Sequence, residues 1–351
     1  MKIGYFCYRL SGTGPRTRAA DIINGVANRS ECDVVVLTNE PAVVSADAEV
    51  TQIDIRNPIE TFLKARRAFS DVDIVHVPIN IYQVLFVRLA YLGPLVAGVG
   101  PGIQNSLFHR VLGRFLGISV KIQKQEDERQ WEQLGYTTAS VTATIDRSHF
   151  YQYEPERIDQ LRSERGIDSE QTVVLYVGEL TEGQGAAIID EMARITQDDD
   201  SIQYIVAGAG PLEERFRDRS DLIFEGFVDN KSMPQLYNIA DVTAATRKYD
   251  VTSNVGLESI ACGTPVITTA SGKIEKIFKN RGTYVWADRD SQSVLETVDE
   301  LMSDPEYYQS QVNRGFQTME EMDLTLESAI ETHLDVYRRL GARDRSTGQP
   351  R

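Results

Sequence analysis

Two carboxylates, Asp250 and Glu258, stand eight positions apart in the stretch KYDVTSNVGLESIACGTPVIT, residues 248–268. Between them lies the polar run Thr252-Ser253-Asn254, and the residues that follow have a helical pattern closed by a glycine. The run is therefore expected at a helix N-terminus, whose backbone N–H groups bind anions or sugar hydroxyls. Asp250, just before the helix, can accept hydrogen bonds from hydroxyls. Glu258, about one turn inside, can accept them from a diol such as a ribose.

The simpler interpretation is that both acids only complement the helix dipole. The spacing of the two acids fits both interpretations. The strands and helices expected around them distinguish the two. In the second half of the chain we expect strands at 172–177, 202–207, 222–224, 241–245 and 265–269. The polar run then leaves the end of a buried strand, which favours a binding loop.

The first half shows the same alternation of β-rich runs and helical patterns. Strands are expected at 2–8, 33–38, 50–55, 73–77, 94–99, 118–123 and 138–143, and helices at 15–28, 58–69, 81–92, 103–116 and 126–135. Such alternation predicts α/β domains with parallel sheets covered by helices on both faces. The charged stretch 151–166 divides the halves, so we expect domains over 1–150 and 151–323, and a disordered tail at 342–351. Ligands of two such domains are expected in a cleft between their strand ends.

Composition narrows the class of protein. The 351 residues carry a formal net charge of −15, which argues against nucleic-acid binding because that needs a basic face. Nine lysines stand against 28 arginines, and an acidic, lysine-poor surface suits a salty cytoplasm. The three cysteines are widely spaced and fit neither a metal site nor a disulfide framework, so we expect a reducing, cytoplasmic setting. The start has no signal-peptide layout and no apolar run is long enough to span a membrane.

Residues 172–304 carry an ordered series of motifs. They read VLYVGELTEGQG, IVAGAGPLEERF, FEGFV, MPQLYNIADV, the pair Asp250 and Glu258, ACGTPVI, SGKIEKIF and SDPE. This order resembles the nucleotide-sugar-binding half of family 4 glycosyltransferases, which have the GT-B fold of two Rossmann-like domains facing each other across a cleft. The first half resembles the family loosely, through Ser11-Gly12-Thr13-Gly14 and VTATIDRSHF near the hinge.

The resemblance implies a retaining glycosyltransferase that moves a sugar from a nucleotide-sugar donor to a glycan or lipid-linked acceptor, without metal or cofactor. It also implies a last helix, 324–341, that returns to the first domain, with Leu326, Ile330, Leu334 and Tyr337 on one stripe. The implied site residues are Glu258 on the ribose, Asp250 on the donor sugar, Thr252, Ser253 and Asn254 on sugar hydroxyls or phosphate, and Gly12, Gly14 and Gly178 in the phosphate loops.

This chain departs from the family pattern at the phosphate loop. Glu179 and Gln184 stand where the family usually has arginine and lysine, and Asp250 stands where glutamate is usual. Losing two cations beside a diphosphate costs several kcal/mol, at roughly 1.5–3 kcal/mol for each charged hydrogen bond. The candidates for compensation are Arg16, Arg18, Arg247 and Lys248, which flank the two loops. The alternatives are an unusual donor, or a non-catalytic relative that binds a sugar nucleotide or a partner enzyme. A GT-B epimerase shares the fold but fits the motif order less well.

No acidic residue occurs between Asp73 and Glu126, a gap of 52 positions. One explanation is that this segment is the buried centre of the first domain. The other is that residues 103–124, with their exposed leucines, phenylalanines and unopposed cations, lie on an anionic membrane surface. In that case the protein works at the inner face of the cell membrane, where a lipid-linked acceptor is within reach.

Overall fold

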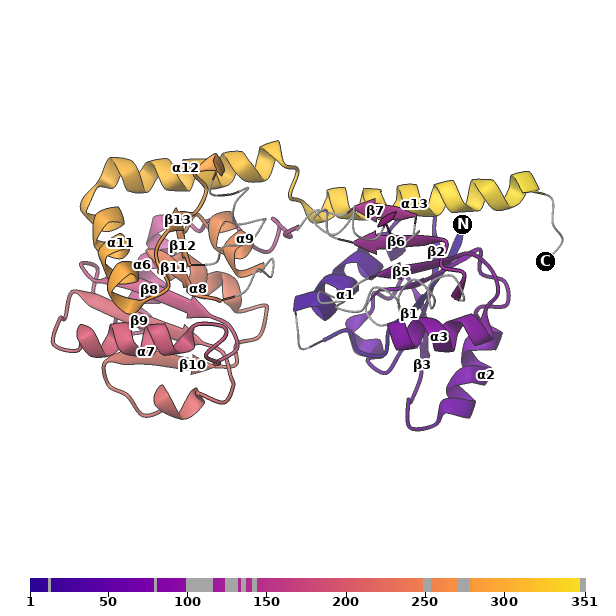
Figure 1. Cartoon of the computed structure of the whole chain (residues 1–351), viewed down its shortest axis with the longest axis horizontal. Helices are drawn as coiled ribbons and strands as arrows, with labels where there is room; N and C mark the ends of the chain where they lie inside the picture. Colours follow the sequence, from indigo (N-terminus) through magenta and orange to yellow (C-terminus); the bar gives the residue numbers. More distant parts are fainter. Residues whose placement is uncertain are drawn as a thin grey trace. The chain divides into compact units, whose positions relative to one another are not determined.

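The chain folds into two compact units in a computed structural model, one made of Met1–Ala143 with Leu326–Arg351 and the other of Thr144–Thr325. The structure describes residues 1–11, 14–78, 81–98, 116–123, 132–133, 137–140, 144–248, 254–269, 278 and 280–347. The division thus falls at 143/144 and 325/326, against the predicted 150/151 and 323/324. Figure 1 shows both units as sheets flanked by helices.

The first unit is built on a seven-stranded parallel sheet in the order β3-β2-β1-β4-β5-β6-β7. Its strands are β1 (Lys2–Phe6), β2 (Asp33–Thr38), β3 (Glu49–Gln52), β4 (Ile74–Val77), β5 (Leu95–Gly98), β6 (Val120–Gln123) and β7 (Thr138–Ser140). The helices are α1 (Gly14–Ala27), α2 (Pro58–Ala68), α3 (Ile81–Ala90) and α13 (Leu326–Thr347), with the short 3-10 turn η1 (Pro41–Val43). One core lies between the sheet and α1 with α13, and a second between the sheet and α2 with α3. Valine-rich strands buried on both faces are what a parallel sheet requires.

The second unit has a six-stranded parallel sheet in the order β10-β9-β8-β11-β12-β13. Its strands are β8 (Thr172–Val177), β9 (Ile202–Ala207), β10 (Leu222–Gly226), β11 (Val242–Ala245), β12 (Val266–Thr268) and β13 (Val285–Trp286). The helices are α6 (Pro155–Glu164), α7 (Ala186–Ile195), α8 (Met233–Ile239), α9 (Asn254–Ala261), α11 (Ser291–Ser303) and α12 (Pro305–Glu321), with the 3-10 turn η3 (Glu213–Arg215). Local signals place several helix starts; Asp304, for example, accepts the backbone N–H groups of Glu306 and Tyr307, and Pro305 follows it. The predicted doubly wound α/β class is confirmed.

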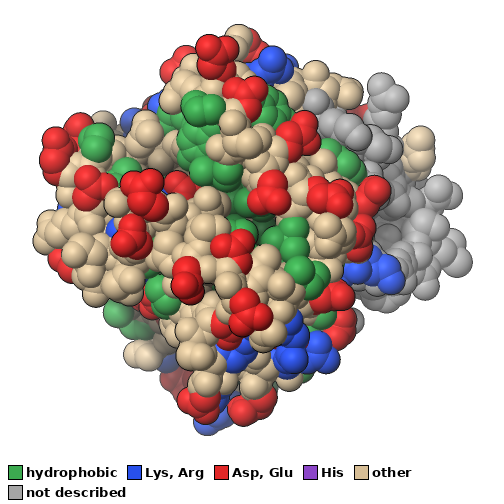
Figure 2. Space-filling view, turned by 90° about the vertical axis from the view of Figure 1, so that its left-hand side faces the viewer, with side chains coloured by type: hydrophobic (Ala, Val, Ile, Leu, Met, Phe, Trp, Pro, Cys, Tyr) green, Lys and Arg blue, Asp and Glu red, His purple; other side chains and the backbone are tan. Residues whose placement is uncertain are grey.

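The surface follows the acidic composition. Figure 2 shows one face of the molecule, over which acidic side chains are spread, with a smaller apolar area between them. None of the helices within the described residues is both long enough and apolar enough to cross a bilayer.

Helix α13 joins the first unit through a buried polar cluster. The Tyr337 hydroxyl lies 2.9 Å from the Tyr5 hydroxyl and 2.7 Å from His76 Nδ1. His333 packs its ring 5.6 Å from that of His76, and its Nδ1 donates to the Ala329 carbonyl at 2.6 Å. The helix continues to Thr347, which corrects the expected disordered tail from residue 342. Alanine and charged helix formers carry the pattern six residues further than expected.

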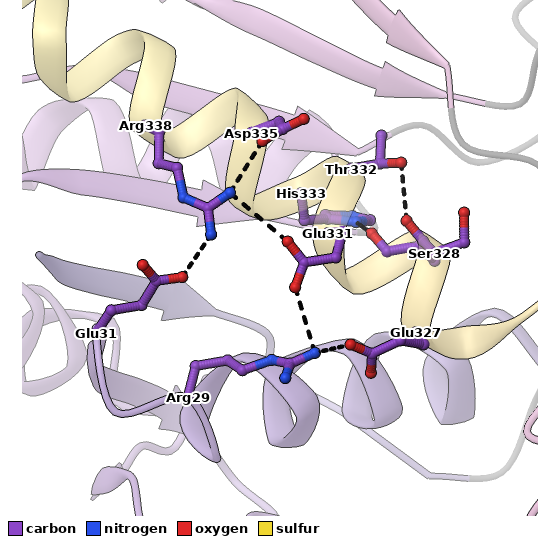
Figure 3. Close-up of polar contacts among 10 residues, drawn as sticks. Arg29, Glu31, Glu327, Ser328, Glu331, Thr332, His333, Asp335 and Arg338 are labelled. Carbon is purple, nitrogen blue, oxygen red and sulfur yellow. Dashed lines mark hydrogen bonds and ion pairs between the residues drawn. The ribbon is translucent and has the colours of Figure 1, made fainter.

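Ion pairs at the surface hold the same helix (Figure 3). Arg29, after α1, pairs with Glu327 and, at 3.3 Å, with Glu331. Arg338 pairs with Glu31 at 2.5 Å and with Asp335 at 3.0 Å. Exposed pairs of this kind are worth less than about 1 kcal/mol each. The buried ring cluster and the apolar stripe therefore contribute more to the docking of α13.

His333 gives this docking a pH dependence. Burial lowers its pKa from 6.5 to about 4, so between these values the unfolded chain binds more protons than the native chain. Stability from this group is therefore full above pH 6.5 and falls as the pH drops toward 4. We expect the free energy of unfolding to fall by about 2 kcal/mol more in the parent than in His333→Gln between pH 7.5 and pH 5. Urea unfolding at the two pH values measures this, and equal slopes would contradict it.

Candidate functional site

The loops after β8, β9 and β11 meet at the carboxyl edge of the second sheet. Leu180 N–H donates to the Ala209 carbonyl at 3.0 Å, and Lys248 N–H donates to the Gly183 carbonyl at 2.9 Å. Strand order reverses between β8 and β11, because the chain runs outward from β8 to β10 and returns at β11. The edge beside such a switch point is where open parallel sheets bind ligands.

Two glycines allow these loops to touch. Gly185 has φ +86°, and a Cβ there would lie 1.9 Å from the Thr246 carbonyl oxygen. A Cβ on Gly208 would lie 1.8 Å from the Gly178 carbonyl oxygen. Thr246 Oγ1 also donates to the Gly185 carbonyl at 3.0 Å. Only glycine fits such approaches, so the β8–α7 loop is fixed against the end of β11.

Hydrogen bonds from a buried tyrosine hold the backbone of the β8–α7 loop. The buried Tyr176 hydroxyl donates to the carbonyls of Glu179 at 3.1 Å and Gln184 at 3.3 Å, and burial raises the pKa of this tyrosine. The side chain of Glu179 is exposed and that of Gln184 half-buried. The sequence did not predict these two hydrogen bonds, because they depend on the buried position of Tyr176 in the folded unit.

Two arginines that the sequence did not single out approach this loop. Arg289 donates to the Glu182 carbonyl at 2.7 Å, and Arg215 lies 3.6 Å from the Glu182 carboxylate. Arg215 follows the glycine turn after β9 and Arg289 follows β13, so both come from strand ends. They place positive charge near the β8–α7 loop.

Glu258 lies on α9, which begins at Asn254, so it is one turn inside the helix as predicted. The Tyr237 hydroxyl donates to Glu258 Oε2 at 2.7 Å. Tyr237 is fully buried, and burial together with the neighbouring carboxylate raises its pKa well above the ordinary value. Thr264 Oγ1 donates to the Tyr237 carbonyl at 2.6 Å, which ties α8 to the turn after α9. The half-buried carboxylate is thus held by a rigid phenol that stays protonated.

The other predicted residues divide between described and undescribed parts. Asp250, Thr252, Ser253 and Gly12 lie outside the described residues, as does most of 103–124. Arg247 is half-buried and Lys248 exposed at the end of β11, and the Arg247 carbonyl accepts from Thr269 Oγ1 at 3.0 Å. In the first unit, α1 begins at Gly14 and carries the half-buried Arg16 and Arg18. Burial is the main cause of the lowered pKa of His333, and the positive charge of Arg18 lowers it further.

An internal carboxylate already occupies the backbone donors at the start of the glycine loop in the first unit. Glu40 Oε2 accepts from Leu10 N–H at 2.6 Å and Ser11 N–H at 2.9 Å, and Oε1 accepts from Ser11 Oγ at 2.8 Å. Burial raises the pKa of Glu40, but these hydrogen bonds outweigh it and leave the pKa below its usual range. Both N–H groups are therefore hydrogen-bonded within the first unit.

Comparison with known proteins identifies the domain that holds this geometry. Residues 157–318 match the family model described as glycosyl transferases group 1. These residues form a group 1 glycosyltransferase domain. The described residues contain no group of three or more side chains placed to hold a metal ion.

Curated relatives share this domain at low identity. An uncharacterized glycosyltransferase of Methanocaldococcus jannaschii is 29% identical over 158 residues, covering 42% of this chain and 40% of the relative. A GDP-mannose-dependent alpha-(1-6)-phosphatidylinositol dimannoside mannosyltransferase of Mycobacterium tuberculosis is 24% identical over 191 residues, covering 53% and 49%. The chain thus spans about half the length of the curated relatives it matches.

Solved structures extend the likeness to both units. Anabaena HepE, solved with UDP, matches with a TM-score of 0.77 at 16% identity over 97% of this chain and 100% of that chain. Sucrose-phosphate synthase from Thermosynechococcus elongatus matches with a TM-score of 0.75 at 16% identity over 97% and 99%. At such identities the likeness concerns the fold, and the predicted GT-B fold is confirmed.

Proposed function

We propose that the protein transfers a sugar, with retention of configuration, from a nucleotide-sugar donor to a glycan or lipid-linked acceptor. The observation that carries this is Glu258. Its carboxylate is fixed by Tyr237 one turn inside α9, at the sheet edge where the β8–α7 loop and the end of β11 meet. A carboxylate held there accepts the two hydroxyls of a ribose, while the helix N-terminus faces more distal parts of the donor.

The remaining roles follow the family resemblance. Asp250 orients the donor sugar, and Thr252, Ser253 and Asn254 bind its hydroxyls or the outer phosphate. Gly12, Gly14 and Gly178 let backbone approach the diphosphate. The leaving diphosphate is stabilised by cationic side chains and helix N-termini, with no metal or cofactor required.

The names of relatives support the donor class. The mycobacterial relative is named for GDP-mannose, and HepE was solved with UDP-glucose. Because these differ in base and sugar, neither is transferred to this chain. The acceptor class is likewise supported by the name of a relative, which is named for a phosphatidylinositol dimannoside.

A second candidate is a non-catalytic protein that binds a sugar nucleotide or a partner enzyme. It is favoured by Glu179, an exposed acid at a position where the family pattern has a cation, and by Glu40 beside the glycine loop of the first unit. Transfer and hydrolysis assays over UDP-, GDP- and ADP-sugars separate the two. We expect turnover of at least one donor; tight binding of a donor without any turnover would support the second candidate.

Basic side chains that compensate for the cations missing from the phosphate loop are expected to strengthen binding of a diphosphate but not binding of a bare nucleoside. Arg16, Arg18, Arg247 and Lys248 are each changed to glutamine, and binding of a nucleoside diphosphate is compared with that of the bare nucleoside. At least one change, most directly at Arg247 or Lys248, should weaken diphosphate binding about tenfold or more while nucleoside binding is unchanged. Arg281→Gln, which breaks a surface pair with Glu321, is the control. Four variants without such a difference would contradict compensation by these residues.

A further inference from the structure

The chain begins the second unit with a short irregular stretch, residues 145–153, which we call the connecting segment. At its start, Ile145 forms an isolated parallel bridge with Thr325, and Ile145 N–H donates to the Leu324 carbonyl at 3.2 Å. Thr325 is the last residue of this unit before the chain returns to the first. The two places where the chain passes between the units are therefore joined by backbone contacts within the second unit.

The other end of the connecting segment is held by α8. Tyr153 N–H donates to Asn238 Oδ1 at 2.6 Å, and Asn238 Nδ2 donates to the Tyr151 carbonyl at 3.0 Å. His149 Nε2 lies 2.8 Å from the carbonyl oxygen of Asn230, in the loop before α8. Because Asn238 is buried, its amide would lose these partners without gaining water if the segment moved. The segment is therefore fixed in place on this helix.

Phe150 lies between these contacts and packs on the ring that holds Glu258. Its side chain is 3% exposed, and its ring centroid is 6.1 Å from that of Tyr237 at an interplanar angle of 64°. This edge-to-face arrangement is one that aromatic pairs prefer. The hydroxyl of the same Tyr237 donates to Glu258 Oε2 at 2.7 Å, across the contact between α8 and α9 (Figure 1). Phe150 and Glu258 thus contact different parts of one buried tyrosine.

We propose that Phe150 is a positioning residue for the Glu258 carboxylate. The connecting segment sets the orientation of the Tyr237 ring, and the tyrosine hydroxyl sets the carboxylate. The inference rests on the proposed function, in which Glu258 binds the ribose of the nucleotide.

The physical reason is the space that the phenyl ring fills. A smaller side chain at position 150 leaves a cavity beside Tyr237, and buried neighbours relax partly into such a cavity. A short hydrogen bond to a carboxylate depends on distance and angle, so a tilted ring holds Glu258 less firmly. If Phe150 only filled the core, its loss would lower stability and leave the affinity of the folded protein for nucleotide unchanged.

Calorimetric titration of the full chain with UDP, GDP and ADP tests this. The nucleoside diphosphate that binds the parent most tightly is then titrated into each variant. Phe150→Leu is expected to weaken its binding about three- to tenfold, because the carboxylate is less well placed. The control Leu301→Ala removes a fully buried side chain from the core between the sheet, α7 and α11. It should lower stability but change the affinity by less than about twofold.

A double-mutant cycle shows whether Phe150 acts through Tyr237. In Tyr237→Phe the hydroxyl is absent, so adding Phe150→Leu should weaken binding further by less than about twofold. Urea unfolding and circular dichroism establish that each variant is folded at the temperature of titration. If Phe150→Leu does not fold, Phe150→Met takes its place, because methionine fills irregular space but has no rigid ring.

The outcomes separate this inference from the proposed function. If a nucleoside diphosphate binds the parent and Phe150→Leu changes its affinity no more than Leu301→Ala does, the inference alone is wrong. It is also wrong if Phe150→Leu costs as much affinity in Tyr237→Phe as in the parent. If none of the three nucleoside diphosphates binds the folded parent, the proposed function fails and the inference fails with it.

Discussion

Replacing Gly185 with alanine is expected to lower the free energy of unfolding of the second unit by about 2–4 kcal/mol. The residue has φ +86°, which an alanine adopts only with strain. The added Cβ would also lie 1.9 Å from the Thr246 carbonyl oxygen, so the backbone at the end of β11 must move. Urea unfolding measures the loss. Because the β8–α7 loop moves with it, binding of the sugar nucleotide should weaken as well.

Gly166→Ala is the matched control for this change. Gly166 has φ +70°, but no atom lies within 4 Å of the Cβ that alanine would add. We expect only the strain of the left-handed conformation, about 1 kcal/mol. If both variants lost the same stability, the close approach between the loop and β11 would not constrain the site.

Glu258→Gln is expected to weaken binding of the sugar nucleotide by about 1–3 kcal/mol while the fold survives. The amide keeps the size of the side chain but replaces one accepting oxygen and the negative charge that a ribose diol binds. Calorimetric titration with a nucleotide that binds the parent measures the change. Unchanged affinity would remove Glu258 from the ribose site.

Tyr237→Phe tests how much the position of the Glu258 carboxylate contributes to binding, apart from its charge. It removes the hydroxyl that donates to Glu258 at 2.7 Å and leaves the acid in place. A smaller loss than with Glu258→Gln is expected, because the carboxylate still accepts hydrogen bonds but is held less firmly. A loss larger than that of Glu258→Gln would indicate that the tyrosine itself contacts the ligand.

The sequence predicts most of the fold because its strands are regular. The strands β2, β8 and β9 occur over the residues expected, since each is a short apolar run bounded by turn residues. The strand β13 was missed because two residues, Val285 and Trp286, give no periodic signal. The stripe of Ile330, Leu334 and Tyr337 was visible in the helical pattern, and the structure buries all three. Their partners on β1 and β4 were not visible, because those strands lie hundreds of positions away in the chain.

Only those features of the candidate site that arise from residues close together in the sequence could be predicted. Glu258 and the glycine loop follow from spacing and from family resemblance, and the start of α9 at Asn254 agrees with the pattern. The donation from Tyr237 to Glu258 and the capture of Ser11 N–H by Glu40 join different elements. Such contacts depend on the tertiary fold, and the only sequence signals were a tyrosine in an apolar helix and an acid after a strand.

The most direct measurement is a thermal shift of the intact chain against UDP-, GDP- and ADP-sugars, with Glu258→Gln alongside. A ligand at about 100 times its Kd adds about 2.7 kcal/mol to the stability of the native state, so its Tm rises measurably. We expect one class of sugar nucleotide to raise the Tm of the parent and to raise that of Glu258→Gln much less. If no sugar nucleotide changes the Tm of the folded parent, the second unit is not a sugar-nucleotide site.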